Sequence, residues 1–188
     1  MLQTQKASKM IYRLFKNKKF LGAILAVLLI TSFGCTKLKL PALTCNIDGT
    51  EYQSALVVAN HGEVFEGQNG FLILASDEFD LSEGHYLGIL VRGEEVGKYD
   101  LQLQLDNGKA QCGVIYKPNG ENDTNDVYLG TSGYVEITEV DSENNRISGK
   151  FEFELVNGDN KTIKITDGEF KNVIYTNVTL SDLDSFDN

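Results

Sequence analysis

Strict alternation of apolar and polar residues over positions 148–155 is the feature that most constrains the fold. Four small or apolar residues, among them Phe151 and Phe153, would line one face of a strand, and polar or charged residues would line the other. This period of two, with one solvent-exposed face, is the pattern of an antiparallel sheet that covers a core. Residues 99–106 alternate in the same way. The pattern therefore predicts half-buried strands.

Turn sequences separate the predicted strands. Asn-Gly or Asp-Gly pairs stand at positions 48–49, 107–108 and 157–158, and such pairs supply the positive φ angles that tight hairpins need. We find no amphipathic helical segment, although one short helical turn would fit within residues 76–83. The expected strands number nine or ten and lie near residues 44–48, 50–59, 63–66, 70–76, 85–93, 97–105, 110–117, 127–140, 146–156 and 162–175.

The last predicted strand changes face along its length. Ile165 falls on an odd position of the apolar alternation, whereas Phe170 falls on an even one. A slip of one residue at Asp167-Gly168 would bring both side chains to the same face. We therefore place a β-bulge or kink there.

These patterns predict an all-β fold. We expect a single antiparallel domain over residues 44–180, built as a β-sandwich or a flattened barrel. A lipocalin-like up-and-down barrel is the alternative, because hairpin follows hairpin with few long connections. The acidic residues 181–188 are expected to form a frayed tail.

The first 34 residues have the composition of an export signal. Six basic residues and no acidic residue precede Phe20, and an apolar stretch of fifteen positions follows from 20 to 34. A helix needs about 18 or more apolar residues to cross the hydrocarbon core of a bilayer. A basic n-region followed by an h-region is therefore the preferred interpretation, giving a signal peptide over residues 1–34.

The residues just before Cys35 indicate lipidation. Thr31-Ser32-Phe33-Gly34 resembles the lipobox of bacterial lipoproteins, with Ser32 where Leu is usual, as in the relaxed lipobox of Bacteroidota. We expect cleavage before Cys35, a palmitate-type lipid on this residue, and a tether over residues 35–43; an uncleaved anchor or ordinary secretion is the alternative. The basic Thr36-Lys37-Leu38-Lys39 favours a periplasm-facing position on the outer membrane over surface display.

The charge of the processed chain argues against several partners. Without residues 1–34, 11 basic and 27 acidic residues remain, a formal charge of −16. Such a surface repels phosphate backbones and anionic head groups. We therefore expect no nucleic acid partner, and attachment to the membrane through the lipid on Cys35.

Four segments together resemble a known family. They are Cys45–Tyr52, Gly133–Thr138 (GYVEIT), Arg146–Phe153 (RISGKFEF) and Ile165–Phe170 (ITDGEF). Their order is similar to that in an uncharacterised family of Bacteroidota lipoproteins, a domain of unknown function, over most of residues 44–175. The resemblance implies an all-β fold and an envelope location, and it implies no catalytic residue.

The residues that could carry catalysis or bind a metal form no known motif. His61 and His85 lack the spacing of a zinc site; we expect His61 in a polar loop and His85 at the start of a strand. Gly130–Gly133 is not a nucleophile elbow and is expected to be a flexible loop. We predict no catalytic residue, no metal and no cofactor.

Acidic residues are frequent enough to pair by chance. Asp167 with Glu169, or Glu94 with Glu95, could serve glycoside hydrolysis, but no feature of the sequence singles out one pair. The loops 121–126 and 141–145 are rich in oxygen ligands for calcium, yet neither has EF-hand spacing. Asp and Asn also form turns through local hydrogen bonds, and turns are the preferred interpretation.

Cys45 and Cys112 are the only cysteines besides Cys35. In an oxidising compartment they could form a disulfide; two buried free thiols are the alternative. For function, we expect a non-catalytic envelope lipoprotein that contacts another envelope protein or glycan. The alternatives are a module that binds a glycan or a small apolar ligand and, less favoured, a carboxylate-dependent glycan hydrolase.

Overall fold

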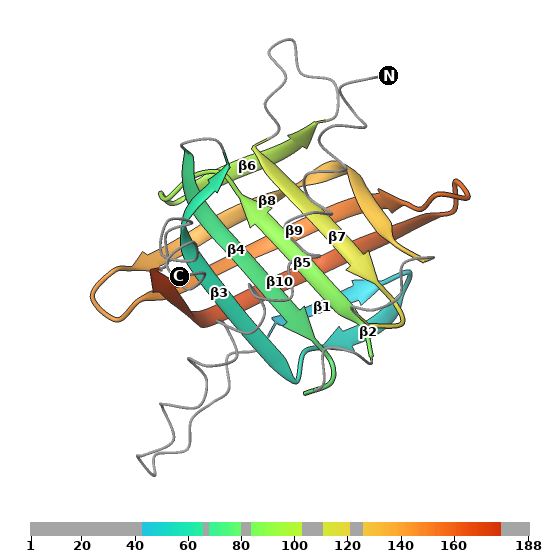
Figure 1. Ribbon diagram of the computed structural model, residues 1–188, viewed down its shortest axis with the longest axis horizontal. Coiled ribbons are helices and arrows are strands. Elements are labelled where there is room, and N and C mark those ends of the chain that lie inside the picture. The colour runs from blue at the N-terminus through green and yellow to red at the C-terminus, as the bar shows by residue number, and fades with distance from the viewer. Residues whose placement is uncertain (1–42, 66–67, 80–83, 103–110, 121–125, 178–188) are drawn as a thin grey trace, which may run out of the picture. The chain divides into compact units, whose positions relative to one another are not determined.

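The computed structural model describes residues 43–65, 68–79, 84–102, 111–120 and 126–177, and within these ranges it is all-β (Figure 1). No helix in these ranges is long and apolar enough to cross a membrane. Residues 41–188 form a compact unit by themselves. The described strands are β1 (Leu43–Ile47), β2 (Thr50–Gln53), β3 (Leu56–Phe65), β4 (Gln68–Ser76), β5 (Tyr86–Val91), β6 (Gly97–Gln102), β7 (Cys112–Lys117), β8 (Tyr128–Asp141), β9 (Arg146–Val156) and β10 (Thr162–Asn177).

Seven of these strands close into a barrel, in the ring order β9, β10, β3, β4, β5, β7 and β8. Neighbours in the ring are antiparallel except β10 and β3, which pair in parallel from Tyr175↔Ala59 to Asn177↔His61. A closed ring of purely antiparallel neighbours needs an even number of strands, so a ring of seven must contain a parallel pair. The all-β prediction is confirmed, whereas the prediction of a purely antiparallel sheet is wrong at this pair.

Two long strands, β8 and β10, each pair along one edge with two different strands and so belong to both layers of the barrel. β8 pairs along one edge first with β7, at Tyr128 and Leu129, and then with β6 over residues 132–137. β10 likewise pairs first with β1 and then with β3. Register shifts in both strands fall between the two partners, where a bulge lets a strand bend. Figure 1 shows the result as a front layer of β3, β4, β5 and β7 that crosses β8, β9 and β10 behind it.

The predicted bulge in β10 is confirmed. The register against β9 shifts between Ile165 and Gly168, and Asp167 has a φ of 53°. A Cβ at Gly168 would lie 2.5 Å from ring atoms of Phe151. The bulge therefore turns Phe170 back toward the core, and the glycine leaves room for the neighbouring ring.

Three local predictions are corrected. The sequence predicts one strand over 50–59 and another over 63–66. In the structure the strand boundary lies near Ser54 instead, which gives β2 and a longer β3. Residues 130–133 lie inside β8 rather than in a loop, because Gly133, with a φ of 131°, kinks the strand without ending it. β1 begins at Leu43, one residue earlier than expected, and residues 80–83 and the tail 181–188 lie outside the described ranges.

The interior of the barrel is filled by side chains. One cluster of buried apolar residues draws on both layers, and its largest members include Phe71, Phe151 and Phe170, each at most 1% exposed. The rings of Phe151 and Phe170 stack with centroids 6.3 Å apart. A small barrel is expected to be filled in this way, and every member of the cluster comes from the described part of the domain.

Candidate functional site

His61 makes polar contacts through both of its ring nitrogens, and it stands in β3 rather than in the predicted loop. It occupies the same row as Phe71 of β4, which belongs to the core cluster, so its ring lies on the inner side of the wall near one end of the barrel. The ring centroid is 4.9 Å from that of Phe71 and 5.5 Å from that of Tyr175. Its side chain keeps 24% of its surface exposed.

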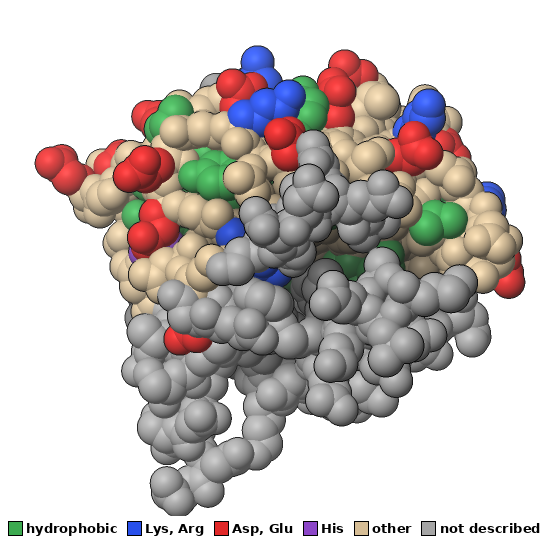
Figure 2. All heavy atoms as spheres, turned by 90° about the horizontal axis from the view of Figure 1, so that it is seen from above, with side chains coloured by type: hydrophobic (Ala, Val, Ile, Leu, Met, Phe, Trp, Pro, Cys, Tyr) green, Lys and Arg blue, Asp and Glu red, His purple; other side chains and the backbone are tan. Residues whose placement is uncertain are grey.

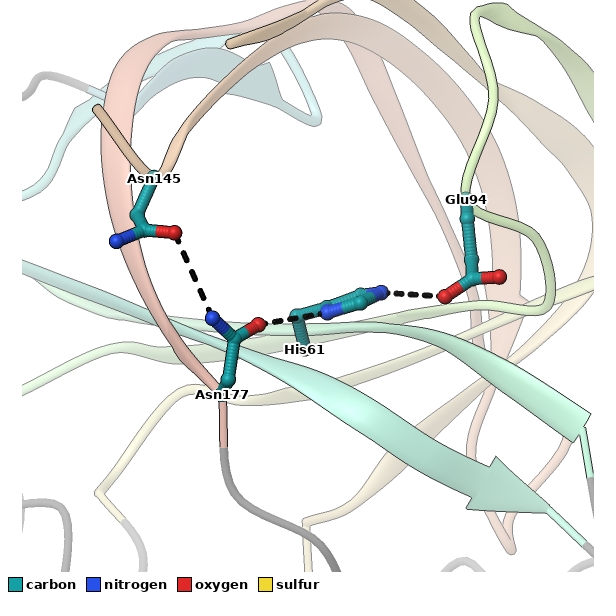
Figure 3. Close-up of polar contacts among 4 residues, drawn as sticks. All are labelled: His61, Glu94, Asn145 and Asn177. Carbon is teal, nitrogen blue, oxygen red and sulfur yellow. Dashed lines mark hydrogen bonds and ion pairs between the residues drawn. The ribbon is translucent and has the colours of Figure 1, made fainter. Parts of the chain in front are cut away.

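Oxygen atoms hold both nitrogens of this ring (Figure 3). Nε2 lies 2.6 Å from Oε1 of Glu94, and Nδ1 lies 2.8 Å from Oδ1 of Asn177. The Asn177 amide in turn donates from Nδ2 to Oδ1 of Asn145, at 3.5 Å. The ring therefore has an oxygen atom within hydrogen-bonding distance on each side.

These contacts join four separate segments of the chain. Glu94 follows β5, Asn145 lies in the β8–β9 turn, and Asn177 ends β10. The cluster acts as a polar tie at the end of the barrel where the parallel pair closes the ring.

A second histidine contact lies at the opposite end of β5. His85 comes directly before β5, as predicted. Its Nδ1 is 2.9 Å from Oδ2 of Asp77, and its backbone N–H donates to Oδ1 of the same carboxylate, at 2.6 Å. The Tyr52 hydroxyl donates to the His85 carbonyl at 3.4 Å. One carboxylate therefore ties together the two sides of the β4–β5 connection.

Buried tyrosines surround this second contact. Tyr52 and Tyr116 lie near His85, and Tyr116 also lies near Tyr128, with ring centroids 6.1 Å apart. Burial raises the pKa of the Tyr52 and Tyr116 hydroxyls well above the ordinary value, and the charge of Asp77 adds to the effect. Both hydroxyls therefore stay protonated at neutral pH, and that of Tyr52 donates to the His85 carbonyl.

Cys45 and Cys112 both lie in the core cluster, as free thiols. They belong to β1 and β7, which are not neighbours in the sheet. The Cys112 thiol donates to the Tyr99 carbonyl at 3.1 Å. Burial raises the pKa of each thiol to about 12, so both are protonated and unreactive at neutral pH.

The structure gives the predicted carboxylate pairs separate contacts. Asp167 accepts from the Asn46 side chain at 3.0 Å, while Glu169 pairs with Lys171 at 2.7 Å. Glu94 contacts His61, and the Glu95 carbonyl accepts from the Tyr99 hydroxyl. The carboxylates of Asp167, Glu169 and Glu94 thus each contact a different neighbour, and the Glu95 contact is made by its backbone.

The second acidic loop forms a local turn. Asp141 accepts from the backbone and side chain of Asn144, at 3.0 and 2.8 Å, and these hydrogen bonds lower the pKa of its carboxyl. This is the turn chemistry expected of Asp and Asn. Most of the first loop, residues 121–125, lies outside the described residues, as does Cys35. Among the described residues, no group of three or more His, Cys, Asp and Glu side chains is placed to hold a metal ion.

Sequence reasoning missed the His61 cluster because its members are distant in the chain. Glu94 is 33 residues from His61 and Asn177 is 116 residues away. No motif spacing marks such a set. Only the strand register, which pairs Asn177 with His61 across the closing strands, brings them together.

Comparison with curated proteins and with solved structures gives no match. A family model does match, over residues 40–174, which include nine complete strands of the domain and most of β10. The matched region contains the four segments whose order suggested a family of unknown function. The chain therefore belongs to the family described as "Domain of unknown function (DUF6252)".

Proposed function

We propose that this chain is a lipoprotein of the bacterial envelope, held on the periplasmic side of the outer membrane by lipid on Cys35, and that it acts by contact rather than by catalysis. One observation carries the proposal. A barrel whose described core begins at Leu43 follows only eight residues after the cysteine of a lipobox-like sequence. The chain thus combines a signal, a modifiable cysteine, a short tether and an independent domain.

The polar groups of the domain support a non-catalytic role. Both nitrogens of His61 are held by oxygens, His85 is held by Asp77, and the core thiols are protonated. Catalytic groups need a pKa and an orientation suited to proton transfer or attack. The described clusters instead bind strands and connections to one another.

The packed interior favours contact at the outer surface over a ligand held inside. A lipocalin-like site needs an open cavity within the barrel, whereas here Phe151, Phe170 and their neighbours occupy the described interior. Binding of an envelope protein or glycan on the outside is therefore the form of the proposal that the geometry supports best.

Replacement of the anchoring cysteine tests the location. Cys35→Ala should remain as an unprocessed precursor or leave the membrane fraction, and mass spectrometry of the wild type should find acyl groups on Cys35. Cys45→Ala is the matched control, because it alters a thiol inside the domain and should leave lipidation unchanged. Wild-type protein free of acyl mass and free in the periplasm would contradict the anchor.

Two further measurements test the orientation and the contact role. Protease added to intact cells should spare the domain; loss of the domain would show surface display instead. Affinity capture from detergent-solubilised envelopes, with a glycan array beside it, should return a reproducible partner. Turnover of an envelope glycan or peptide, lost on changing a single acid, would overturn the non-catalytic role.

A further inference from the structure

The connection from β4 to β5 presents an aromatic side chain to solvent. Phe79 follows shortly after β4 and is 72% exposed, the largest exposed fraction among the large apolar side chains of the described residues. Burying such a ring is worth about 1.5–3 kcal/mol, and the described fold does not bury it. The ring is therefore open to a ligand.

The two ends of this connection are held together by short contacts. The Asp77 carboxylate meets both the backbone N–H and the ring of His85, at 2.6 and 2.9 Å, and the Asp77 N–H donates to the His85 carbonyl at 3.3 Å. Gly84 has a φ of 73°, and a Cβ there would collide with Oδ1 of Asp77. The glycine thus gives the carboxylate room to reach His85.

The same contacts bring Phe79 and His85 near each other. A Cβ at Gly84 would also lie 2.7 Å from Cγ of Glu78, so Glu78 and Gly84 lie side by side. Phe79 follows Glu78 and His85 follows Gly84, each one Cα step of about 3.8 Å further on. One small ligand can therefore reach both side chains.

His85 contributes an open hydrogen-bonding atom. Its Nδ1 faces the Asp77 carboxylate, which accepts hydrogen bonds, so in the neutral ring Nδ1 carries the proton and Nε2 carries the lone pair. Within the described part of the chain, no hydrogen-bonding group of the protein reaches Nε2, and the side chain is 44% exposed. Asp77 therefore orients a ring whose other nitrogen can bind a ligand.

Buried tyrosines fix the inner side of this ring. Tyr52 and Tyr116 belong to the core cluster, are at most 6% exposed, and have ring centroids 6.3 and 5.9 Å from that of His85. The core thus occupies the inner side of the imidazole. Its exposed side is the one that a ligand can approach.

The charge of this connection selects against anions. Residues 77–85 contain four acidic residues and no Lys or Arg, and Figure 2 shows acidic side chains at many places on the surface that the described residues form. Such a surface repels phosphate and carboxylate groups. Carboxylates and a neutral imidazole nitrogen accept hydrogen bonds from hydroxyl groups, and an exposed aromatic ring can cover the C–H face of a sugar. The combination suits a neutral ligand rich in hydroxyl groups.

We propose that Phe79 and His85 form a carbohydrate-binding site at the β4–β5 end of the barrel, where Phe79 stacks on a sugar ring and Nε2 of His85 accepts from one of its hydroxyls. This inference rests on the contact role proposed above and names a neutral glycan as the partner. A basic peptide fits less well, because a stable protein interface buries about 800 Å² on each partner. A sugar ring needs only one aromatic face and a few hydrogen bonds.

The full processed chain, purified in detergent, is tested on an array of neutral oligosaccharides of glucose, galactose, mannose and N-acetylhexosamines. We expect binding to at least one of them, weakened at least tenfold by Phe79→Ala and at least fivefold by His85→Ala. Val96→Ala is the matched control, because Val96 is 62% exposed beyond the other end of β5, and it should leave binding within twofold. Phe79→Trp should retain binding, and its emission should shift when the bound sugar is added, since the chain contains no other Trp.

The remaining outcomes separate this inference from the contact role. Sugar binding that Phe79→Ala leaves unchanged, or that His85→Ala leaves unchanged in a variant with a normal urea midpoint, overturns the two-residue site and spares the contact role. Binding to no sugar, together with a protein partner from the affinity capture, also overturns this inference alone. Failure of both the array and the capture overturns the contact role as well. Because Phe79 is exposed, its replacement tests the site without removing a core contact.

Discussion

Truncation of one aromatic side chain should measure how tightly the barrel interior is packed. Phe170 is 0% exposed, stacks on Phe151, and lies so close to β9 that a Cβ added at Gly149 would come within 2.4 Å of its ring. Phe170→Ala removes a ring from a site with neighbours on every side. Large-to-small changes of this kind cost about 3–5 kcal/mol, a large share of the 5–15 kcal/mol typical of a whole domain.

The assay is urea unfolding of the chain that starts at Thr36, followed by far-ultraviolet circular dichroism. The free energy of unfolding should fall by about 3–5 kcal/mol, and in a thermal melt of the same chain the melting temperature should fall by roughly 10 °C, at about 2–4 °C per kcal/mol for a domain of this size. Ile174→Ala is the control in the same strand, because its side chain is 43% exposed, and it should cost under about 1 kcal/mol. A loss below about 1 kcal/mol for Phe170→Ala, or equal losses for both variants, would refute a filled interior.

Three further predictions concern titration, thiol access and a close approach of the backbone. The free energy of unfolding should fall as pH rises through about 9–12. The pKa values of Tyr52, Tyr116 and the two core thiols are higher in the folded chain than in the unfolded chain, so the unfolded chain loses these protons first. A urea midpoint that stays constant over that range would contradict these burial effects. Cys45 and Cys112 should resist a maleimide in the native chain at pH 7 and should both react in denaturant without reductant, whereas no reaction in denaturant would show the disulfide. Gly149→Ala should destabilise the fold by about 1–3 kcal/mol in the same urea assay, since its Cβ would meet the Glu136 carbonyl at 2.5 Å; an unchanged midpoint would mean that the strands can separate without cost.

The sequence predicted the local structure of the strands well because alternation and turn residues are local signals. Two such signals are the period of two over 148–155 and the shift of apolar residues from odd to even positions near Asp167. Both depend only on which side of a strand a residue faces, and both are confirmed, in β9 and β10. Gly130–Gly133 was mistaken for a loop because a glycine that kinks a strand has the same sequence signature as one that ends it.

The closure of the sheet and the polar clusters could not be predicted in the same way. The order of strands around the ring depends on pairings between distant segments. The odd number of strands requires a parallel pair only if the sheet closes into a ring, and the sequence does not show that it closes. His61 was expected in a loop because its contacts with Glu94 and Asn177 leave no pattern in the sequence near it. Long-range register, rather than residue type, creates the candidate site.

The parallel pairing of β3 with β10 also determines when folding can finish. A chain is synthesised from its N-terminus, and β3 receives its last neighbour from a segment 116 residues further on. Until that segment emerges, one edge of β3 presents unpaired backbone groups, the kind of edge on which nascent chains aggregate. An incomplete chain that stops before Tyr175 therefore leaves this edge of β3 without its β10 partner, and the backbone groups of that edge stay free to pair with other chains.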